Sequence, residues 1–277
     1  DYVHQSPTES GNFSMSFISW ATAFEKINKD YSSASFQQFL DNRAAVSQHL
    51  GSVNPLSTQM GNYFSGYDST SQSVLMYSFL SAFSGKRAAT YPTTPFPNTP
   101  MPNWRVTYDG LGKIKALKKI FKTVTLSHAY RSSYSFSYTN NLKAKLDGEK
   151  NPTTTDINGN FIFYEQINSV SIAEQFSPLL KVDVSLQNSM QFNVELKKDR
   201  NLALSFANNQ LTEVNGKELV VGTGYRWKNL ELKNPFKKGK NKKGIKSDLN
   251  LKADFSIRQN LTVIRKVVEN VTQPTAG

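Results

Sequence analysis

The chain has 277 residues, a formal net charge of +12 and no cysteine, so disulfide frameworks and thiolate metal sites are excluded. Apolar residues account for 38% and aromatic residues for 12% of the chain, a balance that suits many half-buried strands better than a close-packed helical core. The positive charge has two interpretations, simple solubility or an acidic partner such as nucleic acid or anionic lipid.

Residues 1–24 are predicted to form a first strand and its lead-in. Phe13, Met15 and Phe17 alternate with polar residues over this segment, and a period of two is typical of an extended chain. The sequence contains no apolar run of about 18 residues, the minimum for a transmembrane helix. Such a scan does not detect membrane-spanning strands, so it does not test for a transmembrane β-barrel.

The alternation disappears between residues 25 and 102, where we expect helices and irregular chain without paired strands of normal length. Ser35 is a suitable cap for a helix that ends at Gly51, and a second helix is predicted from about Ser71 to Gly85. Prolines then recur up to residue 102 and favour an extended chain. The section is too long for an ordinary hairpin connection, so we expect a functional loop or small subdomain packed at one end of a sheet.

Alternation returns in residues 103–277 and predicts an antiparallel meander, which makes about seven strands in all. A short strand at 104–108 precedes a lysine-rich connection and a longer alternation up to Tyr138. One face of that longer segment is apolar and aromatic, whereas the other carries mostly Ser and Thr. The alternation at 248–258 is the most regular, with both charge signs on its polar face, which is unusual for a packed core.

Turn signals divide this part of the chain. A polar loop is expected at 140–160, a tight turn at Asn188-Ser189 and a hairpin at Asn215-Gly216. The 222–224 segment, Gly-Thr-Gly, lacks the third glycine and the following helix of a dinucleotide site, so it more simply marks a bend or the close approach of another element.

Two architectures share this alternating pattern. In a soluble β-sandwich the apolar face meets a second sheet, and in a transmembrane barrel it meets lipid while the polar face lines a wet lumen. Hydroxyl-rich polar faces and tyrosine-rich apolar faces favour the barrel. The residues then predicted to face lipid are Leu126, Tyr130, Tyr134, Phe136, Leu180, Val182, Val184, Tyr225, Trp227, Leu249, Leu251, Phe255 and Ile257. Those predicted to face the lumen are Arg131, Arg226, Asp248, Asn250, Lys252, Asp254, Ser256 and Arg258.

Five segments carry a resemblance to a known family. They are PNWRVTYDGL at 102–111, LSHAYRSSY at 126–134, LSFANNQLTE at 204–213, VGTGYR at 221–226 and SDLNL at 247–251. In their order and joint presence they resemble the C-terminal part of the SprA or Sov family. These are the giant outer-membrane translocons of the type IX secretion system of Bacteroidota, which are linked to gliding motility. The resemblance extends from Phe13 to the end of the chain, and family members are several times longer.

The resemblance implies that the chain is mainly β and forms an open arc of a very large transmembrane β-barrel. The helical excursion at about 25–102 would be extracellular, and the strands of 103–277 would form barrel wall with lysine-rich short turns. It further implies a bacterial outer-membrane location with loops at the cell surface. The partners would be outer-membrane lipid, exported cargo proteins, and accessory outer-membrane and periplasmic secretion components. The alternative is a soluble extracellular β-domain that binds glycan or protein.

No catalytic arrangement is recognisable in the sequence, and we expect neither enzymatic activity nor a cofactor or metal. His4, His49 and His128 lack ligand spacing. Lysines cluster at 113–122 and at 237–246, with few interleaved aromatic residues, which argues against a nucleic-acid partner. Each cluster follows a strand of the same direction. We therefore place both on one side of the sheet, the periplasmic side of the barrel interpretation.

Overall fold

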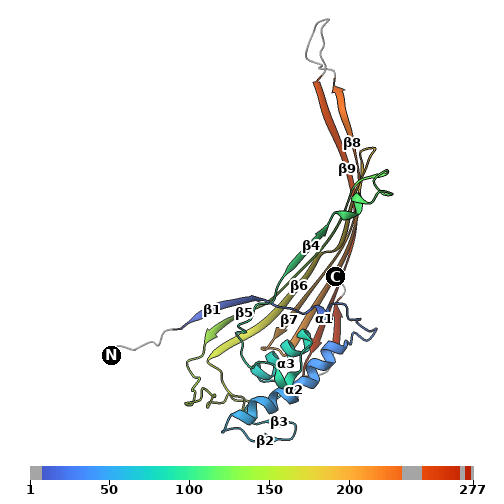
Figure 1. Cartoon of the computed structure of the whole chain (residues 1–277). Coiled ribbons are helices and arrows are strands. Elements are labelled where there is room, and N and C mark those ends of the chain that lie inside the picture. The colour runs from blue at the N-terminus through green and yellow to red at the C-terminus, as the bar shows by residue number, and fades with distance from the viewer. Residues whose placement is uncertain (1–7, 233–244, 269–271, 276–277) are drawn as a thin grey trace.

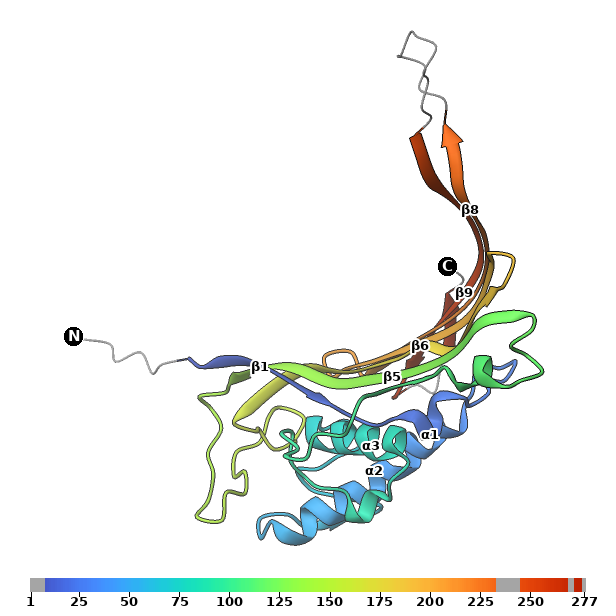
Figure 2. The ribbon, with the colours of Figure 1, turned by 45° about the horizontal axis from the view of Figure 1, so that its top comes forward.

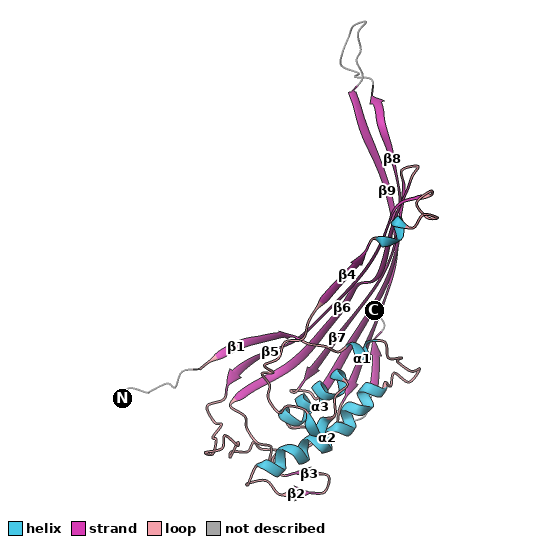
Figure 3. Ribbon diagram, viewed as in Figure 1, coloured by secondary structure: helices cyan, strands magenta, loops and turns pink. Residues whose placement is uncertain are grey.

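The computed structural model describes residues 8–232, 245–268 and 272–275. It is mainly β, with one large antiparallel sheet, α-helices gathered at one end of it, and a 3₁₀ turn, η2 (Gly110–Lys113), toward the other end (Figure 1; Figure 3). The strands of the large sheet are β1 (Ser10–Ser16), β4 (Trp104–Tyr108), β5 (Phe121–Asn140), β6 (Glu165–Leu186), β7 (Met190–Ser205), β8 (Gln210–Leu232), β9 (Ile245–Lys266) and β10 (Thr272–Thr275). Their order is β1-β5-β6-β7-β8-β9-β10, and β4 also pairs with β5.

Strands β1 and β4 are two parts of one interrupted edge strand. Ser16 at the end of β1 lies opposite Ser133 of β5, and Trp104 at the start of β4 lies opposite Tyr130. Ser132 of β5 bridges the interval, since its carbonyl accepts from the Phe17 N–H at 3.2 Å and its own N–H donates to the Asn103 side chain at 2.9 Å. Residues 18–102 are therefore an insertion in an edge strand, which we call the helical insertion.

The meander from β5 to β9 and the open form of the sheet agree with the expectations from sequence. Each neighbouring pair from β5 to β9 is antiparallel and sequential. Over the described residues, β1 and β4 form one edge and β10 the other, and these edges are not paired with each other. The strands curve along their length, and β8 and β9 project beyond the rest of the sheet (Figure 2).

The helical insertion is made of helix and irregular chain, as predicted, with strands of only two residues. Its elements are α1 (Trp20–Ala23), α2 (Ala34–Val53), β2 (Gln59–Met60), β3 (Tyr63–Phe64), α3 (Gln72–Ser84) and the 3₁₀ turn η1 (Ala88–Thr90). The Ser33 hydroxyl caps α2 by accepting from the Phe36 N–H, so the predicted cap at Ser35 is wrong, and the Ser71 hydroxyl caps α3 by accepting from the Val74 N–H. Gly85 ends α3 at a φ of +69°, a left-handed conformation that glycine adopts without a Cβ penalty.

The predicted end of α2 at Gly51 is wrong, because the helix continues to Val53. Gly51 serves packing instead: a Cβ there would lie 2.3 Å from the Phe64 Cβ, so only glycine lets β3 approach the helix this closely. The predicted hairpin at Asn215-Gly216 is also wrong, because both residues lie inside β8. Gly216 faces the Asp199 carboxylate, which a Cβ would meet at 2.4 Å. The turn falls at 206–209 instead, where Asn209 has a φ of +49°.

The helical insertion covers the apolar face of the sheet at one end and makes a mixed core with it. Helix α3 is buried on nearly all sides because it lies between the sheet and α2 (Figure 2). Its Val74, Leu75 and Phe79 belong to the same buried cluster as Tyr134 and Ile172 of the sheet. Burial raises the pKa of Tyr91 in this core to about 12. This end of the molecule therefore has an ordinary two-layer hydrophobic core.

Candidate functional site

The face of the sheet that the helices cover continues past them as an exposed apolar surface. Residues directly opposite one another in antiparallel strands point to the same face. One such row joins Leu180, Leu196, Leu219 and Ile257, and another joins Val182, Val194, Val221 and Phe255. We call this surface the apolar belt. It consists of Val106, Tyr108, Leu126, Leu180, Val182, Val184, Phe192, Val194, Leu196, Leu219, Val221, Tyr225, Trp227, Leu249, Leu251, Phe255 and Ile257.

The apolar belt is wide and uncovered over the described residues. Phe255 is 70% exposed and Ile257 is 68% exposed, whereas monomeric soluble proteins rarely expose contiguous apolar patches of more than a few hundred Å². In β9 the belt runs from Leu249 to Ile257, and a tilted transmembrane strand needs about 9–11 residues. The belt therefore has the length of a membrane crossing in β9, as it has in β8 from Leu219 to Trp227, and it continues over shorter stretches across β4 to β7.

Aromatic side chains lie at both ends of the apolar belt. At the end away from the helices, the rings of Tyr225 and Trp227 contact each other with centroids 4.6 Å apart. At the end beside the helices, Trp20 of α1 contacts Trp104 of β4 at 6.1 Å between ring centroids. Membrane barrels likewise carry aromatic residues at both interfaces of their apolar band.

The opposite face of the sheet, which we call the polar face, carries charges in pairs. Arg226 and Asp248 form the closest pair at 2.6 Å, Lys181 and Asp183 lie 3.2 Å apart, and the Arg258–Asp199 separation is 3.7 Å. Strand pairing places all of the residues predicted to face a lumen on this face: Arg131, Arg226, Asp248, Asn250, Lys252, Asp254, Ser256 and Arg258. The Asp254 carboxylate and the Asn193 amide lie so close to Gly222 that a Cβ there would collide with both. Gly222 thus marks a close approach, as its position in the sequence suggested.

The residues predicted to face lipid also share one face, but they divide into two groups. Leu126, Leu180, Val182, Val184, Tyr225, Trp227, Leu249, Leu251, Phe255 and Ile257 lie in the apolar belt. Tyr130, Tyr134 and Phe136 are buried, the last two in the core shared with the helices. For these three the prediction of a lipid-exposed surface is wrong. The period of the strand placed them on the correct face, and the helical insertion covers that face.

A row of buried charged side chains separates the core from the apolar belt. We call it the charged row; it comprises Glu174, Arg200, Glu213 and Arg265, one from each strand from β6 to β9. Arg200 contacts the Glu174 carboxylate at 3.0 Å, and Arg265 contacts the Glu213 carboxylate at 2.6 Å. Isolated charges are too costly to bury, but paired and hydrogen-bonded charges can be accommodated.

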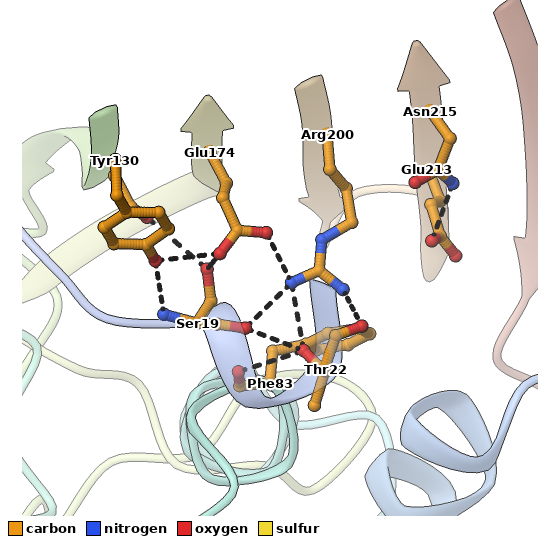
Figure 4. Close-up of polar contacts among 9 residues, drawn as sticks. Ser19, Thr22, Phe83, Tyr130, Glu174, Arg200, Glu213 and Asn215 are labelled. Carbon is orange, nitrogen blue, oxygen red and sulfur yellow. Dashed lines mark hydrogen bonds and ion pairs between the residues drawn. The ribbon is translucent and has the colours of Figure 1, made fainter. Parts of the chain in front are cut away.

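The charged row fastens the start of the helical insertion to the sheet. Arg200 donates to the Ser19 carbonyl at 3.1 Å and to the Thr22 carbonyl at 2.8 Å (Figure 4). The Glu174 carboxylate accepts from the Ser19 hydroxyl and from the Tyr130 hydroxyl, both at 2.8 Å. The Arg265 guanidinium donates to the Tyr31 carbonyl in the same way. Side chains of the sheet thus satisfy backbone groups of a segment that is not itself in the sheet.

The charged row was not predicted from the sequence, although a signal for it exists. All four side chains occupy positions that the alternation assigns to the apolar face, where neighbours such as Ile172 and Leu202 are hydrophobic. A charged residue at such a position has three explanations: the face lines a lumen, the residue was assigned to the wrong face, or the charge forms a buried ion pair. Only the partner strand, which strand pairing reveals, distinguishes these possibilities.

The lysine cluster at 113–122 lies in the connection between β4 and β5, at the end of the sheet away from the helices (Figure 1). The last described residue of β8, Leu232, pairs with Ile245 at the start of β9, and the connection between them lies outside the described residues. Lys246 is in β9, and the remaining lysines of the 237–246 cluster lie outside the described residues. The visible ion pair of the first cluster, Lys113–Asp109 at 3.9 Å, is strongly exposed. Such a pair contributes about 0–1 kcal/mol, so these lysines form a solvated edge.

Comparison with models of known protein families and with curated proteins returned no match. Among the residues that the structure describes, no helix has the length and apolar character needed to span a membrane. Within the same part of the chain, no group of three or more His, Asp or Glu side chains is arranged to hold a metal ion.

Proposed function

We propose that this chain forms part of the wall of a very large outer-membrane β-barrel that exports proteins, and that it belongs to the type IX secretion translocons it resembles. The observation that carries the proposal is the apolar belt. It is uncovered, has the length of a membrane crossing in β8 and β9, and has aromatic residues at both ends. Its residues would contact outer-membrane lipid, and the polar face would line the passage for cargo.

The open edges of the sheet support the same proposal. Unpaired strand edges expose N–H and C=O groups, which soluble proteins avoid and which lipid cannot satisfy. The described strands of this chain leave β1 and β4 at one edge and β10 at the other. In a barrel of up to about 36 strands, these edges would pair with strands that precede and follow this segment.

The alternative, a soluble extracellular domain that binds glycan or protein, requires the apolar belt to be buried against a second layer. The described residues supply such a layer only at the helical end, where α2 and α3 cover the sheet. Phe255 and Ile257 have no such cover. This difference favours the membrane proposal over the soluble one.

In the proposed orientation, the helical insertion and the 141–164 loop face the cell exterior. Outer-membrane barrels have long extracellular loops and short periplasmic turns, and the two longest connections of this sheet lie at the helical end. The lysine-rich connection from β4 to β5 would then be periplasmic. Accessory secretion components would bind the parts of the protein outside the lipid. The chain itself would act by shaping the channel, without catalysis.

Cysteine labelling in cells tests the assignment of the two faces. In the full-length protein, single cysteines at Asn250 or Ser256 of the polar face should react with a bulky membrane-impermeant thiol reagent when the channel is open, and the modification should slow export. Cysteines at the neighbouring Leu251 or Phe255 serve as matched controls and should not react in this way. Equal labelling of both pairs, or complete labelling with unchanged export, would contradict the assignment.

A further inference from the structure

A groove lies where the start of the helical insertion passes over the sheet. Residues 24–27 form one wall, and strands β7, β8 and β9 form the other. Its volume is about 1090 Å³, large enough for a sizeable ligand. The groove opens on the same face as the apolar belt, directly beside the row that contains Leu219 and Ile257. We call it the junction groove.

The junction groove has an excess of positive charge. Lys198 and Lys217 lie opposite each other on β7 and β8, and Lys26 approaches from the insertion. The Lys198 ammonium lies 4.5 Å above the centroid of the Phe24 ring, a cation–π contact that holds this nearly buried side chain at the groove wall.

The carboxylates nearest to these lysines are engaged elsewhere. Glu174 and Glu213 are paired with the two arginines of the charged row. Glu218 contacts Lys197 at 3.7 Å, and the Glu25 carboxylate accepts from the Ser35 N–H at 2.8 Å. Among the described residues, no ion pair joins a carboxylate to any of the three groove lysines. The cations are therefore available to an anionic ligand.

The wall of the junction groove next to the belt is apolar. Leu196, Leu219 and Ile257 line it and continue without interruption into the belt, and Phe24 and Ile27 face them from the insertion. A ligand that matches both parts has an anionic head and a hydrocarbon tail. Free phosphate matches only the lysines, because it has nothing to place against the apolar wall.

We infer that the junction groove binds a membrane lipid with a phosphate-bearing headgroup, and this inference rests on the proposed membrane location. Lys26, Lys198 and Lys217 bind the phosphate, and the acyl chains lie along Leu219 and Ile257. The position agrees with that chemistry, because the groove sits at the helical end of the belt, where headgroups of the outer leaflet would lie. Basic pockets of this kind bind lipid headgroups in membrane proteins, and lysine stems extend readily along apolar surface toward such an interface.

The test uses the full-length protein in phosphatidylcholine nanodiscs that contain a minor fraction of phosphatidylglycerol. Native mass spectrometry counts the phosphatidylglycerol molecules that stay bound after release from the nanodisc. The double variant K198Q/K217Q should bind phosphatidylglycerol about 30-fold more weakly, because each lysine at a membrane surface contributes a factor of about five. K252Q removes an exposed lysine from the polar face of the same sheet and should retain wild-type binding. K198R/K217R keeps the charges and should also retain it.

Three results separate the possibilities. Equal phosphatidylglycerol binding by K198Q/K217Q and K252Q overturns the inference while leaving the membrane location intact. Displacement of the lipid by inorganic phosphate also overturns it, since that result identifies a site for a free anion. Failure of the wild-type protein to enter nanodiscs at all contradicts the proposed function instead.

Discussion

One face of one sheet has two halves with different environments. At the helical end, Phe136 is 5% exposed within a core of helix and strand, and at the other end Phe255 is 70% exposed. Both phenylalanines alternate with polar residues in long strands, so the local pattern of apolar and polar positions is the same. The difference comes from an insertion in a distant edge strand, which covers only one half. Strand period thus determines which face a side chain occupies, and the chain beyond the sheet determines whether that face is covered.

The largest expected effect is a loss of stability on mutation of the charged row, which lies at the boundary between the two halves. Arg200→Ala removes a buried guanidinium and leaves the Glu174 carboxylate without its cation, and breaking a buried ion pair costs about 3–5 kcal/mol. We expect the helical insertion to detach from the sheet at lower urea concentrations. Limited proteolysis of residues 18–102 in the full-length protein, in lipid vesicles with increasing urea, measures this.

Arg258→Ala is the matched control for that experiment. Arg258 also lies within 4 Å of an aspartate, Asp199, but both side chains are exposed on the polar face. An exposed pair contributes only about 0–1 kcal/mol, so protease resistance should stay near the wild-type level. Similar losses for both variants would show that the charged row does not hold the insertion in place.

Truncating one phenylalanine in each half compares the two environments directly. Phe136→Ala removes a ring from the shared core and should destabilise the protein by about 3–5 kcal/mol, the usual cost for a buried phenylalanine. Phe255→Ala removes an equal volume from an exposed site and should cost clearly less. Urea unfolding of both variants in the same lipid checks the difference, and equal costs would indicate that Phe255 is covered in the assembled protein.

A charge placed in the exposed half should reveal its surroundings. Phe255→Arg puts a guanidinium in the middle of the apolar belt, where the expected cost is about 2–4 kcal/mol if the belt crosses a bilayer. Ser256→Arg places the same side chain on the polar face one residue away and should be nearly neutral. The folded fraction of each variant in lipid vesicles is the measurement. A neutral Phe255→Arg variant would argue for water, not lipid, around the belt.

The smallest expected effect concerns alkaline pH and is confined to the covered half. Burial raises the pKa of Tyr91 from 10.0 to about 12 in the folded protein. The neutral phenol is therefore favoured by folding, and its contribution is complete below pH 10 and lost as the pH rises toward 12. Tyr91→Phe should move the loss of helical circular dichroism to higher pH. Tyr108→Phe, in the exposed half, should leave it unchanged.

Much of the sheet could be predicted from alternation alone. Residues of the strands around Tyr138, Leu180 and Leu251 were assigned to the correct faces, because side chains alternate between the two faces and one assigned residue determines the rest. Helix α3 was bounded well because Ser71 and Gly85 are strong caps. Strand alternation and helix caps were therefore sufficient to predict elements whose conformation depends on neighbouring residues in the sequence.

The errors have non-local causes. Asn215-Gly216 resembles a hairpin turn, but strands β7 and β9 pair with it on both sides and hold it extended. The burial of Tyr130 and the pairing of Glu174 with Arg200 depend on a segment near Ser19, far away in the sequence. The interruption between β1 and β4 could not be foreseen either, because it requires both parts to lie along the same neighbour.

Spin labels at Phe255 and Ser256 test whether the apolar belt is exposed to lipid. Each position carries a nitroxide in the full-length protein reconstituted into lipid vesicles, and its collision rates with oxygen and with a water-soluble nickel complex are measured. If the belt faces lipid, the label at Phe255 meets oxygen preferentially, since oxygen concentrates in the bilayer, and the label at Ser256 meets the nickel complex. A label at Phe255 that meets the nickel complex as readily as the one at Ser256, or that is shielded from both reagents, would contradict the account.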